Sequence, residues 1–580
     1  MAGHQAARGF HDKMPIVRWP RRIWTAGLVV TLVGVLSVPL VRLVQGGEVY
    51  TLLPNLQVDA GSYDALAQEV ARTRSLSAIP PTFAPGFIAI LAMVYATFGH
   101  SIVAAKTLLW LCLVLATIGA AILARRVHGT AVAGWTAALL TASSAALQAY
   151  TGTLQYEVLV AAVILALIAW ALQVHATGTP GAAVRRAILL GAALGVSVLI
   201  RETIITLVPV FALFVAHQAT LRTRARVGVA AGLAVLVCAM GVPLAWSAAE
   251  THRLGRVMLV RDNVQGILPF GHNPYANGTW NASLAGIGEP SGVAFMLAEP
   301  RLELRLLGRK FMYFWGVLRD GWNVPRPWAV WLARATGGLL PLDLILPVVR
   351  GGWILAALIV ACIMLRGDQW REFWLLPGVV ATLMSVHLVT ISSHRFAIPV
   401  LPVAFIIVAG VVSRVATRAG ALGLAVMVVV IAAGSTMQAY QWPVTYRLQP
   451  TELDGVNGEN RIEPDGRLVR VSDAARGQRA AFALYDEYLP SGQVTLRLQV
   501  RRGAGELPME TPVARISLFL LDGSPPCFAE IAIGQLAPPG EWTRFTASCT
   551  LANDGPARLI ADTLGRVDLS FGEVLLQWRR

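Results

Sequence analysis

The chain has 580 residues, of which 55% are hydrophobic and only 14% are charged, and its formal net charge is +15. About a quarter of the residues in a soluble chain are charged, so this composition excludes an ordinary soluble protein and favours a membrane protein. The positive charge does not indicate a nucleic-acid-binding protein, because the arginines lie between long apolar runs and do not form one basic domain.

The first apolar run, residues 23–44, follows a basic N-terminal segment, residues 1–22. A basic flank before an apolar run also occurs in signal peptides, but this run is longer than theirs and has no small-residue cleavage site. We therefore predict a cytoplasmic N-terminal tail and a retained first membrane helix.

Further apolar runs along the chain can span or nearly span a bilayer. They cover residues 102–124, 131–149, 154–174, 187–200, 203–216, 227–247, 344–365, 373–391, 396–413 and 421–437. If the chain crosses the membrane at each run, its arginine clusters fall on the cytoplasmic side, as the positive-inside rule requires. These clusters are Arg125 and Arg126, Arg185 and Arg186, Arg222, Arg224 and Arg226, Arg366 and Arg371, and Arg414 and Arg418. The sequence thus predicts a membrane domain of about eleven helices within residues 23–440.

One shorter apolar segment, residues 84–98, complicates the topology. It is short for a normal span, and counting it would move every later arginine cluster to the outer side. We predict a re-entrant or interfacial helix, and the alternative is a hidden extra pair of spans, about thirteen in all. The two runs that flank Arg201 and Glu202 are also short, which predicts that their outer junction lies deep in the domain.

This topology places residues 45–85 and 248–343 outside as loops, together with everything after residue 437. From about residue 446 the composition becomes that of a soluble domain, and residues 493–501 alternate apolar and polar side chains as a half-buried strand does. The pattern continues in residues 513–521, 527–533, 541–549 and 567–578.

These strands predict an antiparallel β-sandwich of the jelly-roll kind over residues 446–580, outside the membrane. Its role is either to bind carbohydrate or purely structural, and Phe482, Tyr485, Tyr488 and Trp542 are the aromatic residues available to stack on a sugar. Its two cysteines, Cys527 and Cys549, either form one disulfide or stay free thiols.

The first outer loop carries the most specific motif. Asp59 is followed four residues later by Tyr63, and then by Pro80-Pro81-Thr-Phe-Ala-Pro85. This order resembles the first loop of the C-type superfamily of polytopic membrane glycosyltransferases, of the protein-O-mannosyltransferase and aminoarabinose-transferase kind. Many members have Glu directly after the Asp where this chain has Ala60, so a role for a second acid there does not carry over.

The resemblance implies an enzyme that transfers a hexosyl or pentosyl group from a polyprenyl-phosphate donor to an acceptor on the outer face of a bacterial inner (plasma) membrane. The acceptor is a glycan, a lipid or a protein, membrane lipids surround the enzyme, and nucleic acid is no partner. The resemblance fixes no cofactor, and a divalent cation is left open. The sequence leaves two other functions open: a transporter or flippase of lipid-linked sugar, and a non-catalytic glycan-binding envelope protein.

Asp59 is the residue that we assign as the catalytic base. An acceptor hydroxyl must lose its proton as it attacks the anomeric carbon, and a carboxylate within hydrogen-bond reach can take that proton. One base with a phosphate leaving group predicts inversion of the anomeric centre. The alternative is structural: Asp59 caps a helix that begins near Tyr63, with Asp64 as a solvated residue of its first turn.

Glu157 is a second candidate catalytic acid, one turn inside the outer end of an otherwise apolar helix. Ionisable groups inside spans are usually functional, because an unpaired charge there is expensive. The family has an acid near this outer turn, so the resemblance implies that Glu157 holds the acceptor or supports the base. A carboxylate stabilised by the helix dipole is the alternative.

Two arginines lie on the predicted outer side, against the positive-inside pattern. Arg201 resembles the family's Arg-Pro after a short helix, with Glu202 in place of Pro, and Arg395 resembles its Arg-Tyr entry to a late helix, with Phe396 in place of Tyr. A guanidinium matches a phosphate bidentately, so we predict that both arginines bind the donor phosphate, and we include His394 as a candidate substrate-binding residue. The alternatives are a local Arg201–Glu202 ion pair and a snorkelling Arg395.

The large outer loop adds His272 and Asn273, in a Gly-His-Asn-Pro stretch that resembles one in bacterial relatives. We include both, with Tyr63, as candidate substrate-binding residues. His387 is predicted to be a satisfied core histidine, and no spacing of cysteine and histidine indicates a zinc site. Some relatives have a lysine before the Pro-Pro motif where this chain has Ile79, which leaves phosphate binding to arginine.

Overall fold

The computed structural model describes most of the chain. The described residues are 21–46, 54–174, 179–258, 260–261, 267–268, 271–272, 276, 278, 292–317, 354, 358–359, 374–419, 444–448, 459–463, 468–489, 492–520, 527–551 and 555–579. The predicted runs 344–365 and 421–437 lie almost wholly outside these residues. The total number of membrane spans therefore stays a prediction.

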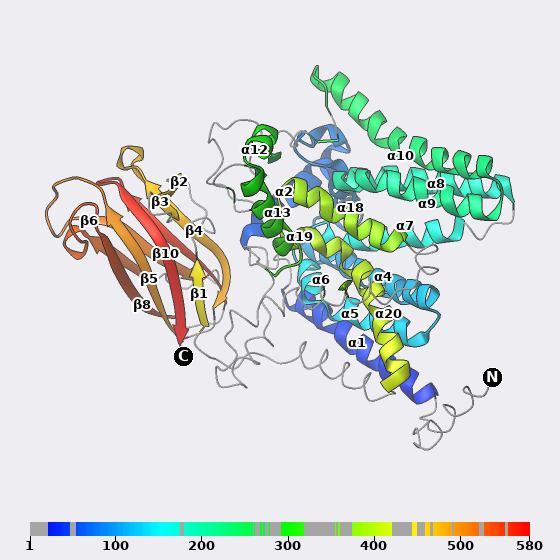
Figure 1. Ribbon diagram of the computed structural model, residues 1–580, viewed down its shortest axis with the longest axis horizontal. Helices are drawn as coiled ribbons and strands as arrows, with labels where there is room; N and C mark the ends of the chain where they lie inside the picture. Colours follow the sequence, from blue (N-terminus) through cyan, green and yellow to red (C-terminus); the bar gives the residue numbers. More distant parts are fainter. Residues whose placement is uncertain are drawn as a thin grey trace, which may run out of the picture.

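The described membrane part is a bundle of apolar helices (Figure 1). Its main helices are α1 (Arg21–Gly46), α4 (Ile102–His128), α5 (Ala131–Ser143), α7 (Glu157–Val174), α8 (Pro180–Ile200), α9 (Leu207–Arg222), α10 (Ala225–Leu254), α18 (Leu375–Val389) and α20 (Leu401–Ala419). Five helical segments among the described residues are long and apolar enough to cross a bilayer: Ile102–His128, Pro180–Ile200, Glu202–Leu221, Ala225–Leu254 and His394–Ser413. The predicted polytopic helical membrane fold is confirmed.

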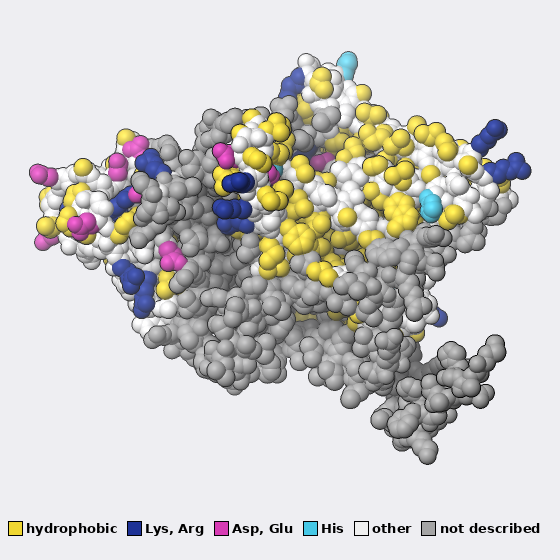
Figure 2. Space-filling model, in the orientation of Figure 1, with side chains coloured by type: hydrophobic (Ala, Val, Ile, Leu, Met, Phe, Trp, Pro, Cys, Tyr) yellow, Lys and Arg dark blue, Asp and Glu magenta, His cyan; other side chains and the backbone are white. Residues whose placement is uncertain are grey.

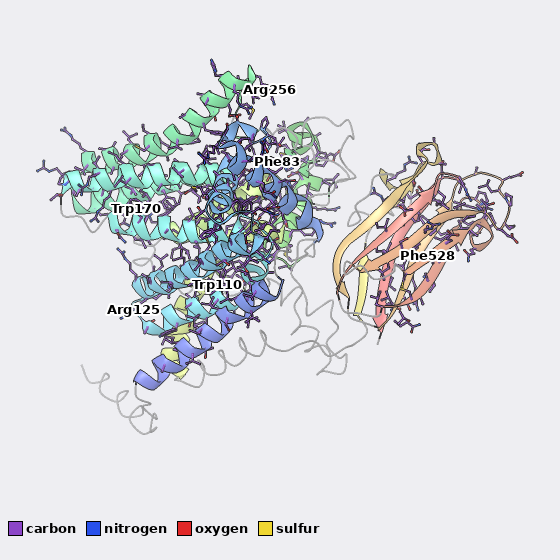
Figure 3. All side chains as sticks on the ribbon, turned by 180° about the vertical axis from the view of Figure 1, so that it is seen from behind. Phe83, Trp110, Arg125, Trp170, Arg256 and Phe528 are labelled. Carbon is purple, nitrogen blue, oxygen red and sulfur yellow. The ribbon has the colours of Figure 1, made fainter. Side chains whose placement is uncertain are left out.

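The surface of this bundle is apolar, as contact with lipid requires. On α4, large exposed side chains recur at helical spacing, namely Leu111, Leu115, Ile118 and Ile122. Figure 2 shows hydrophobic side chains over much of the helical part, with Lys and Arg at its right-hand end, near the upper end of α10 and over α13. Arg125 and Phe83 lie toward opposite ends of the membrane part (Figure 3), which agrees with the predicted topology, in which they face opposite sides of the membrane.

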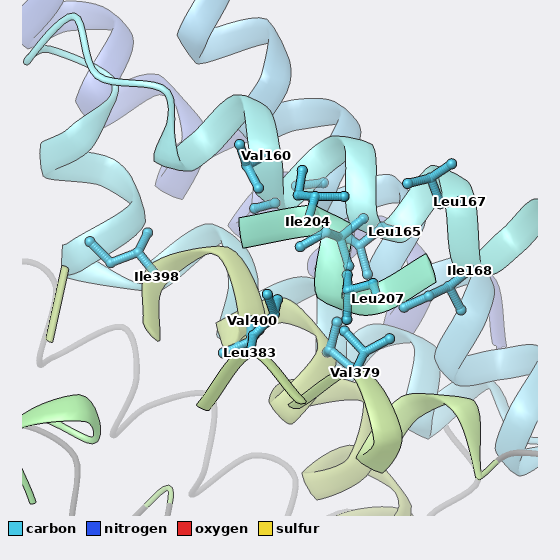
Figure 4. Close-up of a cluster of buried hydrophobic side chains, with 14 of the residues drawn as sticks. Val160, Leu165, Leu167, Ile168, Ile204, Leu207, Val379, Leu383, Ile398 and Val400 are labelled. Carbon is cyan, nitrogen blue, oxygen red and sulfur yellow. The ribbon is translucent and has the colours of Figure 1, made fainter. Parts of the chain in front are cut away.

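The bundle interior is a close-packed aliphatic core (Figure 4). Its members include Val160, Leu165, Ile204, Leu207, Val379, Leu383, Ile398 and Val400. They come from α7, α9, α18 and two 3-10 turns, η2 (Glu202–Thr206) and η5 (Ile398–Val400). Because this core packs α7, η2 and η5 together, the polar residues at their outer ends are brought to one place.

Two helices are longer than their apolar runs predicted. α8 begins at Pro180, and α9 continues to Arg222, because polar and charged residues extend each helix beyond its apolar part. The prediction of two short spans on either side of Arg201 is therefore wrong. Arg201 is nevertheless 4% exposed, at the point where α8 ends and η2 begins.

The first outer loop contains a helix that begins earlier than predicted. α2 (Pro54–Thr73) starts at a proline, a favoured first residue of a helix, and Asp59 lies in its second turn. The alternative of Asp59 as an N-cap is therefore wrong. α3 (Pro85–Phe98) follows and packs against α2 and α8. α3 occupies the segment for which a re-entrant or interfacial helix was predicted. The helix is present, and its position in a bilayer stays a prediction.

Short helices complete the outer end of the membrane part. They are α6 (Ala145–Tyr150), α12 (Gly292–Ala298), α13 (Pro300–Phe314) and α19 (His394–Ala397). α13 packs against both α18 and α19. It therefore supports the segment through which the chain enters α20.

The C-terminal part is an antiparallel β-sandwich of two sheets, as predicted (Figure 1). One sheet has the order β2 (Glu459–Ile462), β3 (Leu468–Ser472), β10 (Leu569–Arg579), β5 (Gly492–Arg502) and β8 (Trp542–Leu551), and β1 (Val444–Leu448) also pairs with β10. The other has the order β4 (Gln478–Leu489), β9 (Gly555–Leu564), β6 (Pro512–Leu520) and β7 (Cys527–Ala532). Alternate residues of β5 point into the core, namely Val494, Leu496, Leu498 and Val500.

The sandwich bears on two open questions from the sequence. Cys527 and Cys549 are free thiols in the structure. Trp542 is half-buried, with the Arg501 guanidinium 4.9 Å from its ring centre, whereas the side chains of the other three aromatic candidates lie outside the described residues. A carbohydrate-binding role for the sandwich stays a prediction.

Candidate active site

Arg395 is the centre of a buried ionic cluster at the outer end of the bundle. It lies in α19 and is 6% exposed. Its guanidinium donates to three oxygen acceptors: Nε to Glu157 Oε1 at 2.5 Å, Nη1 to Asp59 Oδ2 at 2.8 Å, and Nη2 to Gln155 Oε1 at 2.6 Å. The predicted alternative, a snorkelling side chain, is therefore wrong.

Glu157 connects Arg395 to the second predicted arginine. It is the first residue of α7 and is fully buried, so it lies at the helix end and not one turn inside it. Besides its contact with Arg395, its Oε1 lies 3.9 Å from Arg201 Nη1. Its Oε2 has no hydrogen-bond partner among the described residues. The two guanidiniums, and not the helix dipole alone, therefore stabilise the charge of the buried Glu157 carboxylate.

Arg201 is held by neighbours on several sides. Its Nε donates to Thr203 Oγ1 at 2.9 Å, and its Nη2 lies 3.4 Å from His387 Nε2. Its guanidinium carbon lies 5.0 Å from the Tyr156 ring centre and 5.3 Å from that of Phe396. Its Nη1 has no hydrogen-bond partner among the described residues. The Nη1 amino group of a fixed, buried guanidinium is thus left to meet a ligand.

His387 is therefore a neighbour of Arg201 as well as a buried residue of the bundle. Its ring stacks on Phe396, with the ring centres 4.2 Å apart, and its Nε2 faces Arg201. The sequence predicted a satisfied core histidine, and the structure places it as a direct neighbour of a candidate site residue.

Asp59 is the exposed member of the cluster. Its side chain is 40% exposed, whereas that of Arg395 is 7% exposed. An incoming hydroxyl group can therefore reach Asp59, while Arg395 keeps the carboxylate in position from the protein side. This combination of access and fixed orientation suits a general base.

Tyr63 lies one turn after Asp59 in an aromatic cluster. Its ring makes edge-to-face contacts with Phe83, Phe87 and Tyr156, at centre distances of 5.6, 5.3 and 6.0 Å. Burial raises the pKa of Tyr63 well above its usual value, so the phenol stays neutral and keeps its proton as a donor. The cluster packs the Pro-Pro-Thr-Phe turn onto α2, which fixes the backbone that presents Asp59.

Asp64, predicted as a solvated residue, is buried. Tyr95 donates to its Oδ1 at 2.5 Å, Gln68 donates to its Oδ2 at 3.0 Å, and His100 Nε2 lies 3.0 Å from Oδ1. These contacts join α2 to α3 and to the loop after it. Asp64 is thus a structural carboxylate on the helix that carries Asp59.

A third arginine, Arg261, was missed by the sequence analysis. Its Nε lies 3.3 Å from Glu202 Oε1, and the two side chains are 18% and 25% exposed. Burial opposes the charge of Arg261, but the Glu202 carboxylate favours it, and the pKa of Arg261 is raised. The predicted Arg201–Glu202 pair is therefore replaced by an Arg261–Glu202 pair. In the sequence, Arg261 is one of many arginines in a predicted outer loop, and nothing local distinguishes it from the others.

The remaining predicted site residues lie beside the cluster or apart from it. His394 is 2% exposed, and its Nδ1 lies 3.4 Å from the Phe314 carbonyl oxygen. His272 is buried against Glu303 and Lys310 of α13, and no contact with Asp59 or Arg395 is seen. Asn273 lies outside the described residues.

Among the described residues of the site, the numbers of acidic and basic side chains are equal. Three carboxylates, from Asp59, Glu157 and Glu202, face three guanidiniums, from Arg201, Arg261 and Arg395. Both acids nearest to Arg395 are held by guanidinium groups. Within the part of the chain that the structure describes, no group of three or more His, Cys, Asp and Glu side chains could hold a metal ion.

Comparison with protein-family models and with curated protein sequences gives no match for the chain. Among solved structures, the chain is similar to ArnT from Cupriavidus metallidurans bound to undecaprenyl phosphate, with 17% identity and a TM-score of 0.44 over 72% of this chain. The match spans 64% of the length of that protein. The arabinosyltransferase EmbB from Mycobacterium smegmatis matches over 98% of this chain and 66% of its own, with 11% identity and a TM-score of 0.28.

A further match covers 23% of the chain. It is to the C-terminal carbohydrate-binding module of LamC from Zobellia galactanivorans, of which it covers 98%, with 11% identity and a TM-score of 0.17. The solved structures that the chain is similar to thus include membrane glycosyltransferases and a carbohydrate-binding module.

Proposed function

We propose that this protein is a membrane glycosyltransferase that moves a monosaccharide from a polyprenyl-phosphate donor to an acceptor outside the membrane. One observation carries the proposal: the Arg395 guanidinium holds Asp59 and Glu157 in one cluster, with Arg201 beside Glu157. Buried charges at the end of a membrane bundle are expensive, so such a cluster indicates function.

In the proposed reaction Asp59 is the base. The acceptor oxygen attacks the anomeric carbon of the sugar, and its proton passes to an Asp59 carboxylate oxygen. The bond from that carbon to the phosphate oxygen breaks, and the polyprenyl phosphate leaves with the electron pair. One displacement inverts the anomeric centre. The 40% exposure of Asp59 supports this role, because the acceptor needs access to the carboxylate.

The leaving phosphate gains negative charge in the transition state, and arginine guanidiniums can stabilise that charge by donating hydrogen bonds to the phosphate oxygens. Arg201 is the first candidate, because its Nη1 has no hydrogen-bond partner among the described residues. Arg261 is the second, since its partner Glu202 is partly exposed and a phosphate oxygen can replace it. Arg395 already has three acceptors, so its proposed part is to hold Asp59 and Glu157 while its charge faces the phosphate.

The further details of the proposed function rest on the resemblance of the sequence motifs to the glycosyltransferase superfamily named above. They are a hexosyl or pentosyl donor, an acceptor that is a glycan, lipid or protein, a bacterial inner-membrane location, and a C-terminal sandwich outside the membrane that binds the acceptor glycan. The half-buried Trp542 beside Arg501 supports the last of these, because aromatic rings stack on sugars and guanidiniums donate to their oxygens.

The proposal is tested with purified protein in nanodiscs, labelled polyprenyl-phosphate sugars of several kinds, and native envelope fractions as acceptor. Transfer from one donor, with an inverted anomeric configuration in the product, supports the proposal and identifies the donor. Binding of a donor without transfer to any acceptor would point to a flippase. Binding of envelope glycans without any affinity for the donors would point to a non-catalytic glycan-binding protein.

A further inference from the structure

Three titratable side chains form a second buried cluster, separate from the Asp59 site. His272 and Lys310 are fully buried, and Glu303 is 8% exposed. His272 Nδ1 lies 2.9 Å from Glu303 Oε2, and Lys310 Nζ lies 2.9 Å from His272 Nε2. Glu303 and Lys310 both belong to α13, seven positions apart, so they lie on the same face of that helix with His272 between them.

The cluster is attached to the end of α18. His272 Nε2 also lies 2.5 Å from the carbonyl oxygen of Val389, the last residue of α18. The neighbouring backbone is packed as closely: a side chain on Gly271 would meet the Thr390 carbonyl oxygen at 2.2 Å. Ser392 N donates to the Gly278 carbonyl oxygen at 2.9 Å. The outer loop is therefore joined to the chain at residues 389, 390 and 392.

This joined segment leads directly to Arg395. Ser393 caps α19 by accepting from Arg395 N at 3.2 Å, and His394 is packed beneath Gly316, where an added side chain would meet the imidazole at 2.7 Å. The Arg395 segment is thus held at both ends: at Val389 by His272, which Glu303 and Lys310 of α13 hold, and at His394 by Phe314, the last residue of α13, and by Gly316 just after it. The orientation of the Arg395 guanidinium depends on this backbone.

His272 connects α13 to the end of α18 through both of its ring nitrogens. Nδ1 faces the Glu303 carboxylate, and Nε2 lies within hydrogen-bond distance of both Lys310 Nζ and the Val389 carbonyl oxygen. Burial lowers the pKa of Lys310 to about 7, and the Glu303 carboxylate opposes this shift. One buried imidazole thus ties two side chains of α13 to the backbone at Val389.

We propose that Glu303, His272 and Lys310 are positioning residues that fix the segment from Val389 to Arg395 and thereby the contacts of Arg395 with Asp59 and Glu157. The catalytic part of this inference rests on the proposed transferase function. The positioning part does not, because it concerns the order of the segment in the protein without substrate. Nothing in the cluster needs to touch the sugar or the phosphate.

The experiment compares wild type with His272→Asn, Lys310→Met and Glu303→Gln, in nanodiscs, by hydrogen exchange and mass spectrometry. The peptide that covers residues 389–396 is followed. Arg305→Gln is the matched control, since Arg305 is an exposed residue of the same helix. Thermal unfolding of each variant shows whether it is folded, and three variants keep the test usable if one of them fails to fold.

We expect exchange in this peptide to rise about tenfold in the folded cluster variants, the effect of losing one buried hydrogen bond to a charged group. Arg305→Gln should exchange like wild type. Where transfer is measurable, kcat should fall while the KM for the donor stays unchanged, and the loss should be smaller when Arg395 is already replaced by lysine. Unchanged exchange in all folded cluster variants would overturn the inference, whatever the transfer assay shows. Absence of transfer in wild type itself would count against the proposed function only.

Discussion

Arg395 and Asp59 are 336 positions apart in the sequence, yet Arg395 Nη1 donates to Asp59 Oδ2 at 2.8 Å. The contact joins α2, in the first outer loop, to α19, at the start of the last described membrane helix. The same guanidinium holds Glu157 at the start of α7. Three distant segments of the chain thus meet at one side chain, and the predictions below depend on this meeting point.

Replacement of Arg395 by lysine keeps the positive charge and removes the planar fork. An ammonium group cannot hold the three acceptors in their present arrangement, so Asp59 loses its fixed orientation. We expect the transfer rate to fall about 10²–10³-fold, the range for loss of one oriented electrostatic contact. Arg253→Lys is the matched control, because the ion pair of Arg253 within the described part of the chain is with the nearby Glu250 on α10. A rate in Arg395→Lys close to wild type would contradict the role of the fork.

Replacement of Glu157 by glutamine removes the carboxylate that lies between two buried guanidiniums. The remaining charges are left without their buried partner, and we expect the free energy of unfolding to fall by about 3–5 kcal/mol. Adding Arg201→Gln restores the charge balance and should recover part of this loss. Thermal unfolding of the two single variants and the double variant measures the effect. A double variant that loses the sum of both single effects would show that the two residues do not interact.

Replacement of Gly86 by alanine tests how closely α3 packs against the end of α8, just before Arg201. A side chain at this position of α3 would meet the backbone of Leu199 and Ile200 at 2.7 Å, just before Arg201. Gly86→Ala must push α3 away from the end of α8, which we expect to destabilise the protein by about 1–3 kcal/mol and to lower the transfer rate. Gly241→Ala in α10 meets nothing within 4 Å and should be neutral. Equal behaviour of the two variants would contradict the close approach.

The lowered pKa of Lys310 leads us to expect that the stability of the protein depends on pH. The pKa of Lys310 in the folded protein is lowered to about 7, mainly by burial, whereas in the unfolded chain it is near 10.4. Between these values the unfolded chain binds more protons, so the free energy of unfolding rises with pH in this window, and it is lowest below pH 7. Lys310→Met should reduce this rise, and Arg305→Gln should keep it. The measurement is the melting temperature from pH 6 to pH 9. The same slope in Lys310→Met and wild type would rule out a buried lysine as its source.

Much of the fold followed from local patterns in the sequence. Long apolar runs predicted the helices, and the period-two alternation of β5 predicted its buried face. The sequence patterns did not locate β1, β2, β3, β4 or β9. β4 contains irregular pairing between Ala480 and Phe482 and between Leu484 and Glu487, which interrupts the alternation on which strand prediction relies.

Two signals made the site predictable: the first-loop motif, which indicated Asp59, and charges that break a local apolar pattern. Glu157, Arg201 and Arg395 are charges at the ends of apolar runs, and the structure brings all three together. Arg261 and Asp64 could not be recognised in this way, because each lies in a polar segment where a charge is ordinary. Their roles depend on partners far along the chain, Glu202 for Arg261 and Tyr95 and His100 for Asp64.

Asp59 and Asp64 provide the most direct test, because they are two carboxylates on the same helix with different proposed roles. Transfer of labelled sugar by Asp59→Asn and Asp64→Asn is compared per folded molecule with that of wild type. The account predicts that Asp59→Asn folds normally and loses at least about a hundredfold in rate, the usual effect of removing a general base. Asp64→Asn should melt at a lower temperature and keep its rate per folded molecule. A wild-type rate in Asp59→Asn would contradict the assignment of the base.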